Sequence, residues 1–176
     1  TPIKAAGTQP TPPKNDSAPT DAKPLAWGLT HKEWDNALLS EITKADWSGV
    51  KMPIEKLSVV ENVSQLISIM AKYESNFDPK TKYAESGHLA GVTSRGLLQI
   101  SVDSANQSAY GFNVTADDLH NPLINLKVAV KIMHYQAKKH GVLFDGSKTS
   151  GAGSYWSVGR VTSGSFTKIK AYLNTL

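Results

Sequence analysis

Two short stretches decide the fold of this chain: Tyr73-Glu74-Ser75-Asn76-Phe77-Asp78-Pro79 and, downstream, Ser94-Arg95-Gly96-Leu97-Leu98-Gln99-Ile100-Ser101. The first closes an apolar stripe, whose members precede Glu74 at spacings of three, four or seven: Met70, Ile67, Val63, Val60 and Leu57. This spacing predicts a helix from about Pro53 to Tyr73 with Glu74 on its apolar face. Because proline cannot continue a helix, Asp78-Pro79 ends it.

Glu74 is the first candidate functional residue. A carboxyl on the buried edge of a helix loses the solvation of its charged form, so we expect its pKa to be raised, as a general acid requires. At a helix end beside a loop, it would also be within reach of a substrate. The alternative is a surface glutamate in a frayed last turn, and only the second stretch favours a site.

That second stretch reads as a loop that runs into a short extended segment. Gly96 allows another part of the chain to approach closely, and the apolar residues around Gln99 can hold it in place. A fixed glutamine offers a donor and an acceptor, which suit the hydroxyl and acetamido groups of a sugar. The alternative is a buried glutamine that only satisfies loop backbone.

Composition restricts the possible classes of function. A chain of 176 residues with 40% hydrophobic residues fits one domain with a real core, and no run approaches the roughly 18 apolar residues of a membrane span. The absence of cysteine excludes disulfides and a cysteine nucleophile. The net charge of +4 comes from scattered lysines with only two arginines, so nucleic-acid binding is the weakest of our hypotheses. The histidines show no ligand spacing, and we predict no metal site.

The N-terminal part differs in composition from the rest. Six of the nine prolines precede Leu25, which predicts an extended tether over residues 1–25 and a folded domain over 26–176. The tether would link the domain to an anchor, a signal region or another module, or would be a tail without a role. Since the chain begins at Thr1 without a leader, we expect a processed, secreted or periplasmic (cell-envelope) protein.

The remaining elements are mostly helical. Capping-box spacing at Thr30 predicts a helix to about Ala45, Thr115 starts a short capped turn, and Asn121-Pro122 opens a long helix that closes at Gly141. Ser165 is the expected cap of a last helix through Leu176. The fold class expected from these elements is mainly α, as a single helical domain with a small strand and loop region around residues 83–101.

The motifs together resemble the lytic transglycosylase family of the soluble (SLT) type, in the lysozyme superfamily. The family pattern E-S-x-F-x-P matches residues 74–79, G-L-M-Q matches 96–99 with Leu98 for Met, and N-P-x-x-N-(L/I) matches 121–126. The motif A-Y-N-A-G is met in part at 153–158, where Tyr155 fits and Trp156 replaces Asn. The resemblance covers about residues 55–176 and implies a fold of the α+β lysozyme-like kind.

The resemblance implies an enzyme that acts as a monomer on peptidoglycan glycan strands without a cofactor. Glu74 would protonate the β-1,4 glycosidic oxygen between N-acetylmuramic acid and N-acetylglucosamine, then take the proton of the C6 hydroxyl as a 1,6-anhydro ring forms. The substrate's acetamido oxygen would stabilise the cation. The substrate contacts implied are Ser75, Leu98, Gln99, Tyr155 and Tyr172.

Two other hypotheses stay open beside this one. A goose-type lysozyme hydrolyses the same bond with water, and its second carboxylate normally stands where this chain has Ser101. Glu85 and Asp103 are the spare acids that could hold the water, unless they are loop charges that face solvent. A non-catalytic peptidoglycan-binding wall protein would need the groove but not the acid.

Overall fold

The computed structural model describes residues 22–176, so most of the expected tether, residues 1–21, lies outside the described residues. The described part is mainly helical, with one small antiparallel sheet. Its elements are α1 (Lys32–Lys44), α2 (Val59–Ser75), β1 (Lys82–Ala84), β2 (Thr93–Arg95), α3 (Val102–Ala105), α4 (Pro122–His140) and α5 (Gly164–Asn174), with the short 3₁₀ turns η1 (Gly87–Leu89), η2 (Asp118–His120), η3 (Gly151–Ser154) and η4 (Ser157–Gly159). The expected fold class is confirmed.

Helix α2 starts six residues later than its apolar stripe predicts. Ser58 is its N-cap and forms a capping box with Glu61, so Pro53 and Leu57 lie outside the helix. The segment before the cap is held instead by the buried Asn62, whose side chain accepts from the amide of Ile54 and donates to its carbonyl at 3.0 and 2.9 Å. These bonds replace the helical ones that the stripe alone suggested.

Two other helix starts were also predicted wrongly. The cap of α1 is His31, not Thr30, and its ring stacks on Trp34 with centroids 3.7 Å apart instead of capping through its side chain. The cap of α5 is Ser163, which accepts from the amide of Ser165. Helix α4 begins and ends as predicted. Asn121 caps its start by accepting from the amides of Leu123 and Ile124, and Gly141 ends it in the left-handed conformation with φ +73°.

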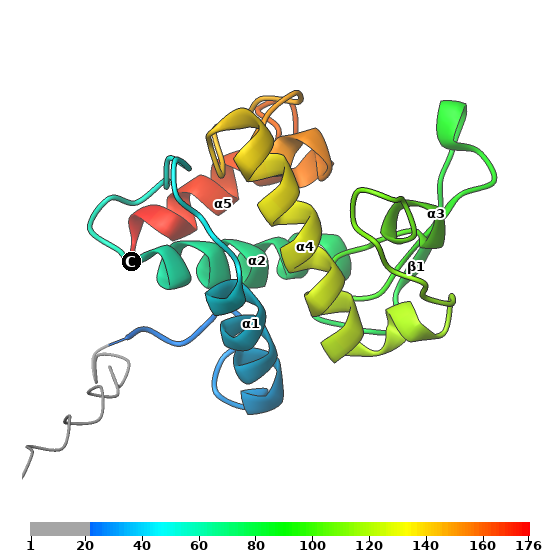
Figure 1. Cartoon of the computed structure of the whole chain (residues 1–176), viewed down its shortest axis with the longest axis horizontal. Coiled ribbons are helices and arrows are strands. Elements are labelled where there is room, and N and C mark those ends of the chain that lie inside the picture. The colour runs from blue at the N-terminus through cyan, green and yellow to red at the C-terminus, as the bar shows by residue number, and fades with distance from the viewer. Residues whose placement is uncertain (1–21) are drawn as a thin grey trace, which may run out of the picture.

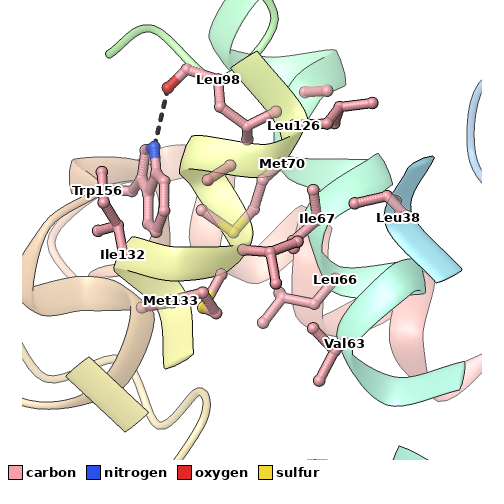
Figure 2. Packing of buried hydrophobic residues seen from close by; sticks show 14 of the residues in the cluster. Leu38, Val63, Leu66, Ile67, Met70, Leu98, Leu126, Ile132, Met133 and Trp156 are labelled. Carbon is pink, nitrogen blue, oxygen red and sulfur yellow. Dashed lines mark hydrogen bonds between the residues drawn. The ribbon is translucent and has the colours of Figure 1, made fainter. Parts of the chain in front are cut away.

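The core forms where α4 crosses α2, with α1 and α5 packed on the outside of this pair (Figure 1). Figure 2 shows the apolar faces of α2 and α4 in contact around Met70 and Leu126. Leu98 and Trp156 close the same core at one end, joined by a hydrogen bond from the indole to the Leu98 carbonyl at 2.8 Å. The core therefore fixes residues on both sides of the second sequence motif.

The small sheet lies at one end of the molecule, beyond the last turn of α2 (Figure 1). In the β1–β2 hairpin Tyr83 pairs with Ser94, and η1 lies in the loop between the two strands. Within residues 22–176 no helix is long and apolar enough to cross a membrane.

Candidate active site

A cleft of about 590 Å³ lies between the β1–β2 hairpin and the segment that follows η3. Glu74 reaches it from the end of α2. The other lining residues that bear on function are Tyr83, Glu85, Ser94, Gln99, Ser101, Ser104, Tyr155, Trp156 and Arg160. Both sequence motifs therefore meet at one cavity.

Glu74 is the partly buried acid that the sequence leads us to expect. Burial and, to a smaller extent, the negative charge of Glu85 together raise the pKa of its carboxyl from 4.5 to about 8. At neutral pH the carboxyl is therefore mostly protonated and can give a proton to a bound molecule.

Glu85 shares the cleft with Glu74, whereas Asp103 does not. The amide of Glu85 donates to the Val92 carbonyl at 2.8 Å, which extends the hairpin pairing, and its Oε1 accepts from Ser94 Oγ at 2.7 Å. Asp103 is exposed on α3 and lies outside the cleft lining. Of the two spare acids, the structure brings only Glu85 to the candidate acid.

Gln99 lines the cleft on a backbone held in an unusual conformation, with φ +48°. Its Nε2 donates to the carbonyls of Thr81 and Gly96 at 3.0 and 2.9 Å, so the amide group ties the loop to the start of the hairpin. No bond within residues 22–176 uses its side-chain oxygen, which remains an acceptor for a ligand. The side chain therefore satisfies loop backbone, as one alternative expected, while a sugar contact through its oxygen stays a prediction.

The buried Asn125 of α4 fixes the strip from Arg95 to Leu98. Its Nδ2 donates to the carbonyls of Arg95 and Leu119 at 3.0 and 2.9 Å, and its Oδ1 accepts from the amide of Leu98 at 2.9 Å. Gly96 must be glycine here, because a Cβ would stand 2.1 Å from the Leu119 carbonyl oxygen. The motif at residues 121–126 includes Asn125, but it predicted only the start of a helix and not this contact with the strip.

Three residues that the resemblance implies as substrate contacts lie elsewhere. Ser75 is buried and donates to the Leu97 carbonyl at 2.9 Å, so it joins the end of α2 to the strip rather than facing the cleft. Leu98 is fully buried in the core. The Tyr172 hydroxyl donates to Gln65 Oε1 at 2.6 Å, on the α2–α5 side of the molecule.

Tyr155 does line the cleft. Burial raises the pKa of its hydroxyl, against a smaller opposing effect of the neighbouring Ser104 and Ser101. Trp156, where the family pattern has Asn, packs edge-on against Tyr155 and is almost fully buried. Its indole bond to the Leu98 carbonyl gives it a structural role.

The sequence reading missed Arg160, which lines the cleft opposite the hairpin and donates from Nε to the Gly153 carbonyl at 2.7 Å. The only feature of the sequence that could have pointed to this residue is that arginine occurs just twice in the chain. No group of three or more His, Cys, Asp or Glu side chains gathers within the part of the chain that the structure describes, so no metal ligand set is seen there.

Comparisons with known proteins show what this chain is similar to. Residues 52–155 match the model of the transglycosylase SLT domain. The structure is similar to that of wild-type Bd0314 DslA, with 29% identity and a TM-score of 0.68 over 84% of this chain and 93% of that one. Two glutamate-to-glutamine mutants of DslA are also similar. One mutant has 29% identity and a TM-score of 0.65 over 80% of this chain and 87% of that one. The other mutant has 27% identity and a TM-score of 0.68 over 85% of this chain and 93% of that one. Comparison with curated proteins gave no significant match.

Proposed function

The chain belongs to the transglycosylase SLT domain family, and from this premise we propose that Glu74 is the general acid of an enzyme that cleaves the β-1,4 bond between N-acetylmuramic acid and N-acetylglucosamine in peptidoglycan. The observation that carries the proposal is a carboxyl with a pKa of about 8 in the cleft where both family motifs meet. Its site of action would be the cell envelope.

Cleavage needs a proton on the departing oxygen and stabilisation of the sugar carbon left behind. The protonated Glu74 supplies the first as the bond from the muramic C1 to the oxygen breaks. The ionised Glu74 that results is then the base for the next step. Gln99 and Tyr155, which line the same cleft, are the proposed contacts that hold the sugar in place.

In the transglycosylase reaction the muramic C6 hydroxyl attacks C1, and its proton returns to Glu74. The product carries a 1,6-anhydro ring and no water is consumed. One carboxyl that passes from acid to base is sufficient for this route, and the family match supports it.

The second candidate is hydrolysis, which the position of Glu85 favours. A carboxylate in the same cleft, anchored by Ser94, can orient a water for attack on C1. The substituted positions of the two DslA mutants are eleven residues apart, the same separation as Glu74 and Glu85. If this route operates, Glu85→Gln removes most turnover; if the C6 hydroxyl attacks, it changes mainly the pH dependence.

The mass of the products released from purified sacculi distinguishes the two routes. A product lighter by one water than the hydrolytic product shows the 1,6-anhydro end. Its absence, with fragments still released, shows hydrolysis.

The proposal as a whole is tested by Glu74→Gln. The substitution keeps the size of the side chain but cannot transfer the proton, so we expect turnover of peptidoglycan to fall by a factor of roughly 100 or more. Glu55→Gln, at an exposed loop position, is the matched control and should keep the wild-type rate. Wild-type turnover by Glu74→Gln would contradict the proposal and leave a binding role.

A further inference from the structure

The cleft contains a cationic group that neither candidate reaction uses. Arg160 makes no ion pair with any acid of residues 22–176, and its one side-chain bond there uses Nε, to the Gly153 carbonyl. Arg160 lines the cleft, and no hydrogen bond within residues 22–176 uses the two terminal amino groups of its guanidinium. The charged groups that share the cleft are Lys82, Glu74 and Glu85, and all three come from the α2 and hairpin side.

The backbone around Arg160 is held tightly. Its amide donates to the Ser157 carbonyl at 3.0 Å, and the next amide, of Val161, donates to Gly146 at 2.9 Å. Gly153, whose carbonyl accepts from Nε, is closely packed, since a Cβ there would stand 2.1 Å from the Ser147 carbonyl oxygen. A guanidinium on such a support keeps its planar fork in place, which lowers the entropy cost of binding an anion.

We propose that Arg160 is a specificity-determining residue whose guanidinium binds a carboxylate of the muramic unit of the glycan. The inference rests on the proposed substrate. Of the two alternating sugars only the muramic one carries carboxylates, either on its lactyl group when the peptide is absent or on the attached peptide. A terminal guanidinium fork fits a carboxylate through two parallel hydrogen bonds. Binding there would fix which sugar lies on the Arg160 side of Glu74.

Binding measured in the Glu74→Gln background tests this without turnover. The three ligands for calorimetry are a glycan oligosaccharide with free lactyl carboxylates, the same oligosaccharide with its peptides, and a chitooligosaccharide of equal length without carboxylates. Arg160→Gln should weaken binding of a carboxylate-bearing ligand about tenfold or more, as expected for a lost charged hydrogen-bond pair, and leave the chitooligosaccharide within about twofold. The ligand that loses affinity identifies the source of the carboxylate.

Two further variants control for charge and folding. Lys127→Gln removes the same charge from an exposed position of α4 outside the cleft, and should leave all three affinities unchanged at equal ionic strength. Arg160→Lys keeps the charge but not the fork, so the carboxylate ligands should lose about threefold; this variant decides if Arg160→Gln does not fold.

Equal losses for all three ligands, equal losses in Lys127→Gln, or no loss at all would each overturn the inference. If the wild type releases no fragments from sacculi but the carboxylate-selective loss is found, the proposed catalysis fails while the role of Arg160 stands.

Discussion

Two carboxyls in unequal surroundings share the cleft. Glu74 is partly buried at the end of α2 and carries its proton at neutral pH, whereas Glu85 lies on the hairpin and accepts a hydrogen bond from Ser94. Two carboxyls in different surroundings are the usual basis for separate acid and base roles in one site. The electrostatic link between them is measurable, since the charge of Glu85 helps to keep Glu74 protonated.

This link predicts a pH profile. The reactive form of Glu74 is the protonated one, so the turnover of soluble glycan fragments by the wild type should fall as pH rises through about 8. Glu85→Gln removes a negative charge that raises the pKa of Glu74, and the falling limb should therefore move to lower pH. Because burial is the larger cause, the limb should stay above the ordinary value of 4.5.

Turnover against pH checks this for whichever of the two reactions operates, provided that the residual rate of Glu85→Gln is measurable. Glu55→Gln serves again as the control and should keep the wild-type limb. A limb that stays in place in Glu85→Gln would show that the two carboxyls do not interact.

The sequence predicted correctly that some candidate residues lie at one site, but not which of the others face away from it. Glu74, Gln99 and Tyr155 line the cleft, but Leu98 and Tyr172 do not, because a motif match does not say which side of a loop faces solvent. Ser75 illustrates the same point, since its hydroxyl turns inward to the Leu97 carbonyl. Arg160 matched no motif, and its place depends on a bond to a carbonyl in a separate turn.

At the scale of elements, apolar periodicity predicted which segments are helical, and side-chain caps decided where they begin. The stripe before Glu74 extends back to Leu57, but the capping box of Ser58 and Glu61 sets the start of α2. Where cap and proline agree, as at Asn121-Pro122, the predicted start is right. The strip between β2 and α3 is different, because Asn125 and Ser75 hold it through contacts distant in sequence.

Gly96 tests how far the strip depends on close packing. Gly96→Ala adds a Cβ 2.1 Å from the Leu119 carbonyl oxygen and 2.4 Å from Asn125 Nδ2, on a backbone with φ +77°. We expect it to lower the free energy of unfolding by about 3 kcal/mol or more and to reduce turnover, because the strip that carries Gln99 must shift. Thermal unfolding and turnover measure the two effects.

Gly111→Ala is the matched control, since Gly111 has φ +74° and open space around it. Gly111→Ala adds the backbone strain without a clash, so it should lower the free energy of unfolding by only about 1–2 kcal/mol and keep full turnover. Equal losses of stability in the two variants would mean that the contact with Leu119 and Asn125 is unimportant.

At the scale of the molecule, the cleft joins three segments that are separate in sequence: the end of α2, the β1–β2 hairpin and the chain from Tyr155 to Arg160. Mainly helical architecture follows from composition and periodicity. The meeting of Glu85 with Glu74 does not follow from them, because each hairpin strand has only three residues and no periodicity sets its position. Its place is set by backbone bonds to the strip, such as Gly96 to the Thr81 carbonyl at 2.8 Å.

Residues just before the expected domain boundary form hydrogen bonds with α2. The side chain of the buried Gln65 donates to the carbonyls of Lys23 and Pro24 at 3.1 and 3.2 Å, and the Leu25 carbonyl accepts from the amide of Gly28 at 2.9 Å. Residues 23–25 therefore contribute to the folded unit, although their composition assigned them to the tether.

A chain that starts at Ala26 should consequently be less stable than one that starts at Ala22. It leaves the buried amide of Gln65 without both carbonyl partners, which we expect to cost about 1–3 kcal/mol and to lower the melting temperature by several degrees. Turnover of soluble glycan fragments well below that temperature should be equal in the two chains, because α2 contributes to the cleft through Glu74, nine residues after Gln65. Equal melting temperatures would show that residues 23–25 do not stabilise the domain. A loss of turnover in the shorter chain would show that these residues act on the cleft through α2.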